Sequence, residues 1–193
     1  ELIENEIDKY INSLKENSLY DSVKYFLKLP SKRVRPLFTL LANSLYNGDH
    51  SFAIPAALSN EIFHNFTLLH DDIMDSSKKR RGFETVHEKW NVNQAILSGD
   101  SMLIMATEFL DFYDSKIQKE LLKLFNSTAL EVCEGQQLDI EFEKKTDIYE
   151  AKEILSNLKS YFLEKNLDQT YLQNALDSIK KINSIMNRMP EKC

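Results

Sequence analysis

The chain has 193 residues, enough for one domain with a buried core, and its net charge of −6 argues against a nucleic-acid-binding protein. Its two cysteines, Cys133 and Cys193, are too few for a disulfide framework and fit a reduced, cytoplasmic compartment. The acidic first residues do not form a signal peptide, and no apolar run is long enough for a transmembrane segment.

Glycine and proline are scarce, with four of each, and apolar residues recur close to every 3.6 positions. This pattern predicts an all-α protein, and no alternation indicates a strand. The expected helices lie around residues 7–14, 36–45, 55–73, 93–113, 115–142, 149–165 and 167–189, with a polar loop over 76–82 and a break over 144–147. Pro36 and Pro55 are each expected in the first turn of a helix.

Three aspartates, Asp71, Asp72 and Asp75, close the strongly apolar helix over 55–73. Residues four apart share a helix face, so the carboxylates of Asp71 and Asp75 can reach one object, such as Mg²⁺. The alternative is a solvated helix end, although carboxylates near a helix C-terminus oppose its dipole. Spacing alone leaves both interpretations open.

Two basic clusters in this acidic chain suggest discrete anion sites. The first contains Lys32, Arg33 and Arg35. Lys32 and Arg35 would share a face at a helix start, where a phosphate could also bind free N–H groups. The second contains Arg80 and Arg81, which suit the phosphates of a metal-bound substrate. A solvated basic surface is the simpler explanation for either cluster alone.

Other polar residues interrupt apolar helices. His64 precedes Asp71 by two turns on the same face, although a lone histidine on an apolar helix is more often a core residue. Gln136, Gln137 and Asp139 form a polar group that a hydrogen-bond network between helices would explain equally well.

Five blocks of sequence, in order, resemble the trans-isoprenyl diphosphate synthase, or polyprenyl synthetase, family. They are Pro30-Ser31-Lys32-Arg33-Val34-Arg35-Pro36, the helix from Glu61 to Asp75, Arg80-Arg81-Gly82 with Thr85-Val86-His87, Ile96-Leu97-Ser98-Gly99-Asp100, and Glu134-Gly135-Gln136-Gln137-Leu138-Asp139. The fourth block is similar to the family's Gly-Asp helix start. The resemblance covers roughly residues 10 to 145 and implies a helical bundle around a central cavity.

The resemblance also implies the reaction. An allylic diphosphate (dimethylallyl, geranyl or farnesyl diphosphate) would be condensed with isopentenyl diphosphate. Asp71 and Asp75 would bind Mg²⁺ and, with Arg80, favour the departure of diphosphate. Asp72 would have a supporting role, and Gln136 would lie near the reacting centre.

Further residues take roles from the same resemblance. The substrate diphosphates would be held by basic residues, namely Lys32, Arg35, His64, Arg80 and Arg81. Phe66, with the smaller Thr67 beside it, would limit the product to farnesyl or geranylgeranyl length (C15 or C20). A homodimer is also implied.

The chain departs from the family pattern in two places. Pro30-Ser31 replaces a glycine pair, which stiffens the loop before Lys32. A second aspartate-rich motif, which supplies the other half of the metal site in this family, is absent from the sequence. We therefore expect one helical domain over 1–193 that lacks an internal segment with core helices near 147–150 and has little activity alone.

Two other functions fit parts of the pattern. A non-catalytic partner subunit of a full-length synthase would explain the absent motif, although it has little reason to keep stacked carboxylates. A helical metal phosphohydrolase could use the pair His70-Asp71, with His50, His64 and His87 as further ligands. A His70 that faces away from the aspartates would argue against that second function.

Overall fold

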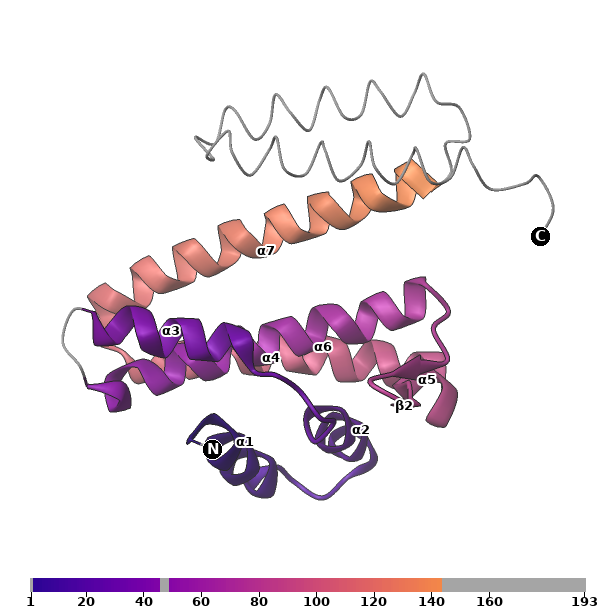
Figure 1. Cartoon of the computed structure of the whole chain (residues 1–193), viewed down its shortest axis with the longest axis horizontal. Coiled ribbons are helices and arrows are strands. Elements are labelled where there is room, and N and C mark those ends of the chain that lie inside the picture. Colours follow the sequence, from indigo (N-terminus) through magenta and orange to yellow (C-terminus); the bar gives the residue numbers. More distant parts are fainter. Residues whose placement is uncertain (1, 46–48, 144–193) are drawn as a thin grey trace. The chain divides into compact units, whose positions relative to one another are not determined.

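The computed structural model of the chain describes residues 2–45 and 49–143 (Figure 1). Its elements, in chain order, are α1 (Leu2–Ser13), α2 (Ser18–Leu27), α3 (Val34–Ser44), α4 (His50–Met74), β1 (Lys79–Arg80), β2 (Phe83–Glu84), α5 (Val86–Lys89), α6 (Val92–Glu108), the 3₁₀ helix η1 (Phe109–Phe112) and α7 (Ser115–Glu143). The prediction of an all-α fold is confirmed. The break expected over 144–147 and the helices expected over 149–189 lie outside the described residues.

The chain divides into two compact units, Glu1–Ser127 and Thr128–Cys193, with the boundary inside α7. In the first unit α4 packs against α6 on one side and α3 on another, and β1, β2 and α5 gather near one end of these helices (Figure 1). No helix in the described ranges is both long and apolar enough to cross a membrane.

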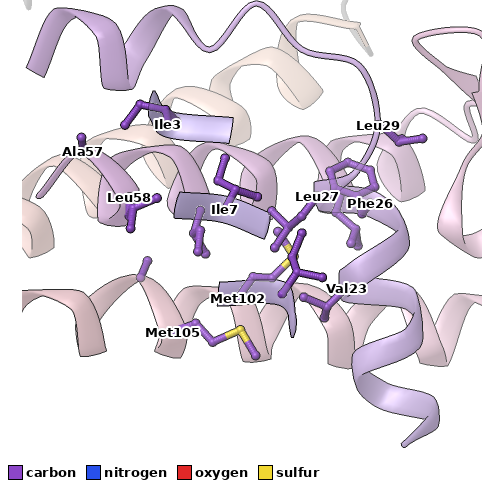
Figure 2. Packing of buried hydrophobic residues seen from close by; sticks show 14 of the residues in the cluster. Ile3, Ile7, Val23, Phe26, Leu27, Leu29, Ala57, Leu58, Met102 and Met105 are labelled. Atoms are coloured by element: carbon purple, nitrogen blue, oxygen red, sulfur yellow. The ribbon is translucent and has the colours of Figure 1, made fainter. Parts of the chain in front are cut away.

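The core of the first unit joins residues from four helices. Figure 2 shows Ile7 of α1, Leu27 of α2, Leu58 of α4 and Met102 of α6 in one apolar cluster. Each is at most 5 % exposed. Complete burial of such a side chain stabilises the fold by about 1.5–3 kcal/mol, so this cluster holds α1 and α2 against α4 and α6.

The central helix begins earlier than expected. α4 begins at His50, and the expected start at Pro55 is wrong. The reason is the side chain of Asp49, whose Oδ1 accepts a hydrogen bond from the backbone N–H of Ser51 at 2.9 Å and so caps the helix. Pro55 consequently lies inside α4 and is buried there.

A tyrosine supports the helix backbone around this proline. The Tyr113 hydroxyl donates to the carbonyl of Phe52 at 2.7 Å and accepts from the N–H of Ala56 at 3.2 Å. These two backbone groups are the pair that an undisturbed helix would join directly. An inserted polar group of this kind is a known way to accommodate a proline within a helix.

Two expected helix starts also differ. α3 begins at Val34, after Arg33 in the left-handed region at φ 46°, so Lys32 precedes the helix and does not share a helical face with Arg35. Gly99-Asp100 lies within α6 and not at its start.

The polar loop expected over 76–82 contains a short antiparallel hairpin, in which Arg80 of β1 pairs with Phe83 of β2. Arg81 and Gly82 form its turn, with φ values of 56° and 87°. Two positive φ values in a two-residue connection are typical of a type I′ turn, which matches the twist of the flanking strands. The expectation of no strand is wrong here because strands of two residues leave no alternation to detect.

Candidate functional site: an aspartate cluster beside a basic cavity

The three aspartates lie at the C-terminal end of α4 with different exposures. Asp75 caps the helix, and its N–H donates to the carbonyl of Asp71 at 2.9 Å. Asp75 is exposed and Asp71 is half-buried, whereas Asp72 is only 1 % exposed. Asp71 and Asp75 can therefore meet a ligand from solvent, and Asp72 faces the protein.

Arg80 connects the hairpin to this cluster. Its Nε donates to Oδ1 of Asp72 at 2.8 Å, and its Nη2 lies 2.6 Å from the same oxygen and 3.3 Å from Oδ2 of Asp71. Burial raises the pKa of the Asp72 carboxyl, and Arg80 opposes that rise. Oδ2 of Asp72 has no hydrogen-bond partner among the described residues. Arg80 is thus the counterion of a buried carboxylate and also a neighbour of the exposed Asp71.

The exposed aspartates offer the chemistry that Mg²⁺ prefers. This ion takes hard oxygen ligands, keeps several waters and is commonly bound by one or two carboxylates together with substrate phosphates. Asp71 and Asp75 provide two such carboxylates on one helix end. Residues 2–45 and 49–143 contain no group of three or more acidic, histidine or cysteine side chains suited to a metal ion. The donor set therefore fits an ion shared with a phosphate ligand and does not form a closed protein site.

His70 does not take part in this cluster. Its Nε2 lies 3.2 Å from the carbonyl of Ile96 in α6, and its ring contacts that of Phe66 at a centroid distance of 4.8 Å. The ring also lies directly over Gly99, where an added Cβ would meet Nε2. His70 therefore faces α6 and not Asp71, which argues against the metal phosphohydrolase.

A cavity of about 410 Å³ lies between the segment before α3 and the middle of α4. It is lined by Pro30, Ser31, Lys32, Arg33, Val34, Arg35, Glu61, His64 and Arg81. The four residues expected to bind one diphosphate, Lys32, Arg35, His64 and Arg81, are thus brought together, although 49 residues separate the first from the last.

The cavity carries an excess of positive charge. Glu61 is buried and is paired with Arg33 at 2.7 Å. Lys32, Arg35 and Arg81, by contrast, form no ion pair with any carboxylate in the described ranges. Burial lowers the pKa of the Arg81 guanidinium, and the Arg33 charge adds to this. Three uncompensated cations around one cavity favour a multiply charged anion as ligand.

His64 is the titratable group of the cavity wall. Its Nε2 lies 2.9 Å from Nη1 of Arg35, so the neutral ring accepts a hydrogen bond from the guanidinium. Burial, and then the charge of Arg35, lower the pKa of His64 to about 4. At neutral pH the ring is uncharged, and a bound anion would offset the charge of Arg35, the second of these two causes.

We expect anion binding to be coupled to proton uptake by His64. The negative charge of a bound diphosphate would raise the pKa of His64 above about 4 by offsetting the charge of Arg35, so between the two pKa values the complex takes up a proton that the free protein lacks. The uptake should be largest between the two pKa values and should vanish well above and well below them. Calorimetric titrations in buffers of different ionisation enthalpy, at about pH 5.5, measure it.

A His64→Gln variant separates this uptake from the protonation of diphosphate itself. The variant should retain only the ligand's own contribution. Equal proton uptake by the parent chain and the variant would contradict the assignment.

The residues predicted to set product length and to lie near the reacting centre do not line the basic cavity. Phe66 is half-buried between the rings of Phe63 and His70, and the Thr67 hydroxyl donates to the carbonyl of His64 at 2.8 Å. Gln136 belongs to the second unit. Its neighbour Gln137 donates to Oε1 of Glu141 at 2.9 Å, a bond along its own helix.

Sequence reasoning missed one residue of the cavity wall. In the sequence, Glu61 marks only the start of a family-like block, and Arg33 is only one member of a basic cluster. The sequence does contain a signal for this pair, because Glu61 is a charged residue in the middle of a strongly apolar helix. Such a residue needs a buried partner, which here is Arg33.

Comparison with known proteins identifies relatives of this chain. A family model described as polyprenyl synthetase matches residues 16–166. The geranylgeranyl pyrophosphate synthase of Geoglobus acetivorans is 37% identical over 154 residues, which cover 78% of this chain and 48% of that protein. The short chain isoprenyl diphosphate synthase of Methanocaldococcus jannaschii is 40% identical over 142 residues, covering 73% of this chain and 43% of the relative.

Solved structures of prenyl diphosphate synthases are also similar to this chain. A geranylgeranyl pyrophosphate synthase crystal structure superposes with a TM-score of 0.73 at 49% identity, covering 76% of this chain and 45% of that one. The chain spans about half the length of the curated relatives it matches. Since the family model covers most of the sequence, this chain belongs to the polyprenyl synthetase family.

Proposed function

We propose that this chain carries the diphosphate-binding half of an isoprenyl diphosphate synthase. The observation that carries the proposal is the basic cavity, in which Lys32, Arg35 and Arg81 have no carboxylate partner among the described residues. The aspartate-bearing end of α4 lies on the same helix as the cavity residue His64. One element thus positions two sites for phosphate chemistry.

The reaction joins two diphosphates head to tail. The bond between the allylic carbon and its diphosphate oxygen breaks, and diphosphate leaves with the electron pair. The double bond of isopentenyl diphosphate then attacks the allylic cation, and a proton is lost to form the new double bond. The difficult step is the departure of diphosphate, so cationic groups near its oxygens favour the reaction.

Each residue acts within this scheme on one of the two substrates. Lys32, Arg35, His64 and Arg81 hold the diphosphate of isopentenyl diphosphate, and Arg80 lies beside the allylic diphosphate. Asp71 and Asp75 would hold Mg²⁺, which supplies Lewis-acid stabilisation of the leaving group when bound. Asp72 keeps Arg80 in place through their ion pair.

Further parts of the proposal concern the product and assembly. Phe66 and Thr67 would limit the product to C15 or C20, and Gln136 would approach the reacting centre. The names of the relatives, which include geranylgeranyl and short chain isoprenyl diphosphate synthases, support a short product. A homodimer and a cytoplasmic location complete the proposal.

Binding of isopentenyl diphosphate to the chain tests the cavity. Arg35→Ala should weaken binding by about tenfold or more, because a charge-assisted hydrogen bond to phosphate is lost. Isothermal titration calorimetry measures this. Lys119→Ala, which removes a positive charge from an exposed position on α7, is the matched control and should bind like the parent chain.

A turnover assay distinguishes the proposed enzyme from the alternative function, a non-catalytic partner subunit of a full-length synthase. Geranyl or farnesyl diphosphate is incubated with isopentenyl diphosphate and Mg²⁺, and products are separated by chromatography. Elongation only after addition of a full-length synthase that co-purifies with the chain would support the partner subunit. Absence of isopentenyl diphosphate binding by the parent chain would refute the proposed cavity.

A further inference from the structure

We propose that Arg33 is a positioning residue that sets the shape of the diphosphate cavity without binding the ligand itself. The inference rests on the proposed function of the cavity. It concerns how the segment with Lys32 and Arg35 is held against α4, where His64 lies.

Arg33 binds three separate elements. Its Nη1 donates to Oε1 of Glu61 in α4 at 2.7 Å, and its Nη2 donates to the carbonyl of Leu27 at the end of α2, also at 2.7 Å. Its Nε and Nη2 donate to the two oxygens of Glu4 in α1, at 2.8 and 3.3 Å. These bonds use four of the five N–H donors of the guanidinium, so no pair of donors remains for a phosphate.

The Arg33–Glu61 pair of this network is buried, and Glu61 is held by a further residue. The Arg33 side chain is 8 % exposed and that of Glu61 is 1 % exposed. Nδ2 of Asn65 donates to Oε1 of Glu61 at 3.0 Å and to its carbonyl at 2.7 Å. Glu61 is therefore fixed by two partners, and it can fix Arg33 in turn. Removal of one partner from a buried pair leaves an uncompensated charge, so this contact is strongly selective for one geometry.

The backbone at Arg33 shows that this geometry is imposed by its surroundings. Its φ of 46° lies in the left-handed region, which costs an ordinary side chain free energy. Its carbonyl nevertheless accepts from the N–H of Leu37 at 3.2 Å and starts α3. Strained residues persist where neighbouring contacts over-determine them, and they cluster at ligand sites.

This conformation decides where the cavity cations lie. Lys32 and Arg35 flank Arg33 on either side, and both line the cavity. The Arg33–Glu61 pair joins this segment to α4 one helical turn before His64, the opposite wall. Loss of the pair would free the segment to move, and the charges of Lys32 and Arg35 would no longer be held around the same cavity.

The test measures the affinity of the full chain for inorganic diphosphate by calorimetry. Arg33→Asn removes the guanidinium but suits the left-handed backbone. It should weaken binding by about tenfold at a temperature where circular dichroism shows that the variant is folded. Met102→Ala, a core substitution in α6 far along the chain from the cavity segment, should lower the melting temperature without changing the affinity.

A second variant keeps the test decisive if Arg33→Asn does not fold. Glu4→Gln removes the charge of the partly exposed partner and should weaken binding by a smaller factor, with faster cleavage after Lys32 by a lysine-specific protease. Unchanged affinity in the folded Arg33 variant, or in Glu4→Gln, would overturn the inference. No binding by the parent chain would overturn the cavity assignment together with it, whereas equal binding by parent and variants overturns the inference alone.

Discussion

Replacement of Arg80 by alanine should destabilise the first unit by about 3–5 kcal/mol at neutral pH. Asp72 is 1 % exposed, and Arg80 is its counterion at 2.6 Å. Without Arg80, a buried carboxylate would remain without a compensating charge. Urea denaturation of the parent chain and the variant, followed by circular dichroism, measures the difference in unfolding free energy.

The pH dependence of this loss identifies its cause. Burial already raises the pKa of Asp72 in the folded protein, and loss of Arg80 removes the main opposing effect. For a carboxyl with a raised folded pKa, stability increases as pH falls through that pKa, because the native state binds the proton. The deficit of Arg80→Ala should therefore shrink between about pH 7 and pH 4.5.

Arg81→Ala is the matched control, because Arg81 is the adjacent residue and forms no ion pair in the described ranges. This variant should keep most of the stability and lose diphosphate affinity instead. Equal destabilisation by the two variants, or an Arg80 deficit that does not change with pH, would contradict the role assigned to the Asp72–Arg80 pair.

Gly99→Ala should destabilise the first unit by about 1–3 kcal/mol, as overpacking in a core does. An added Cβ would overlap Nε2 and Cδ2 of His70, so the ring must leave its place against α6. The bond to the carbonyl of Ile96 would be lost with it. Thermal denaturation is a direct measurement of this loss.

Gly135→Ala provides a matched control within α7. An added Cβ there meets no atom of the described residues within 4 Å, so the substitution should stabilise the helix by about 0.5–1 kcal/mol through its higher helix propensity. In the Gly99→Ala background, His70→Ala should restore part of the lost stability. No rescue by the second substitution would show that the clash with His70 is not the cause.

The fold class followed from the sequence for physical reasons, whereas the cavity residues followed from the family resemblance. A scarcity of glycine and a 3.6-residue apolar period are properties of whole helices, so the prediction of fold class does not depend on any single residue. Lys32, Arg35, His64 and Arg81 were recognised through the resemblance of complete blocks, and the structure does bring them together. Spacing alone had left each of them open to a solvated or buried alternative.

Most failures concern contacts between elements distant in sequence. The start of α4 before Pro55 depends on the local cap of Asp49, which the sequence does contain, and on the hydroxyl of Tyr113, 58 residues after Pro55, which no local pattern encodes. Arg33 was indistinguishable from its basic neighbours in sequence because its burial depends on carboxylates from α1 and α4. Local sequence patterns predict helices well, but they do not reveal which charged side chain is buried and neutralised by a partner from another helix.

The type I′ hairpin has a consequence for which changes in length the chain can accept. Arg80 and Arg81 are consecutive, yet one binds the buried aspartate and the other lines the cavity. Surface loops usually tolerate inserted or deleted residues. Here a single deletion between Asp75 and Arg80 would bring Arg81 to the position that faces Asp72, and a single insertion would bring Lys79 there. We therefore expect the four residues between Asp75 and Arg80 to be fixed in number even where their identities vary.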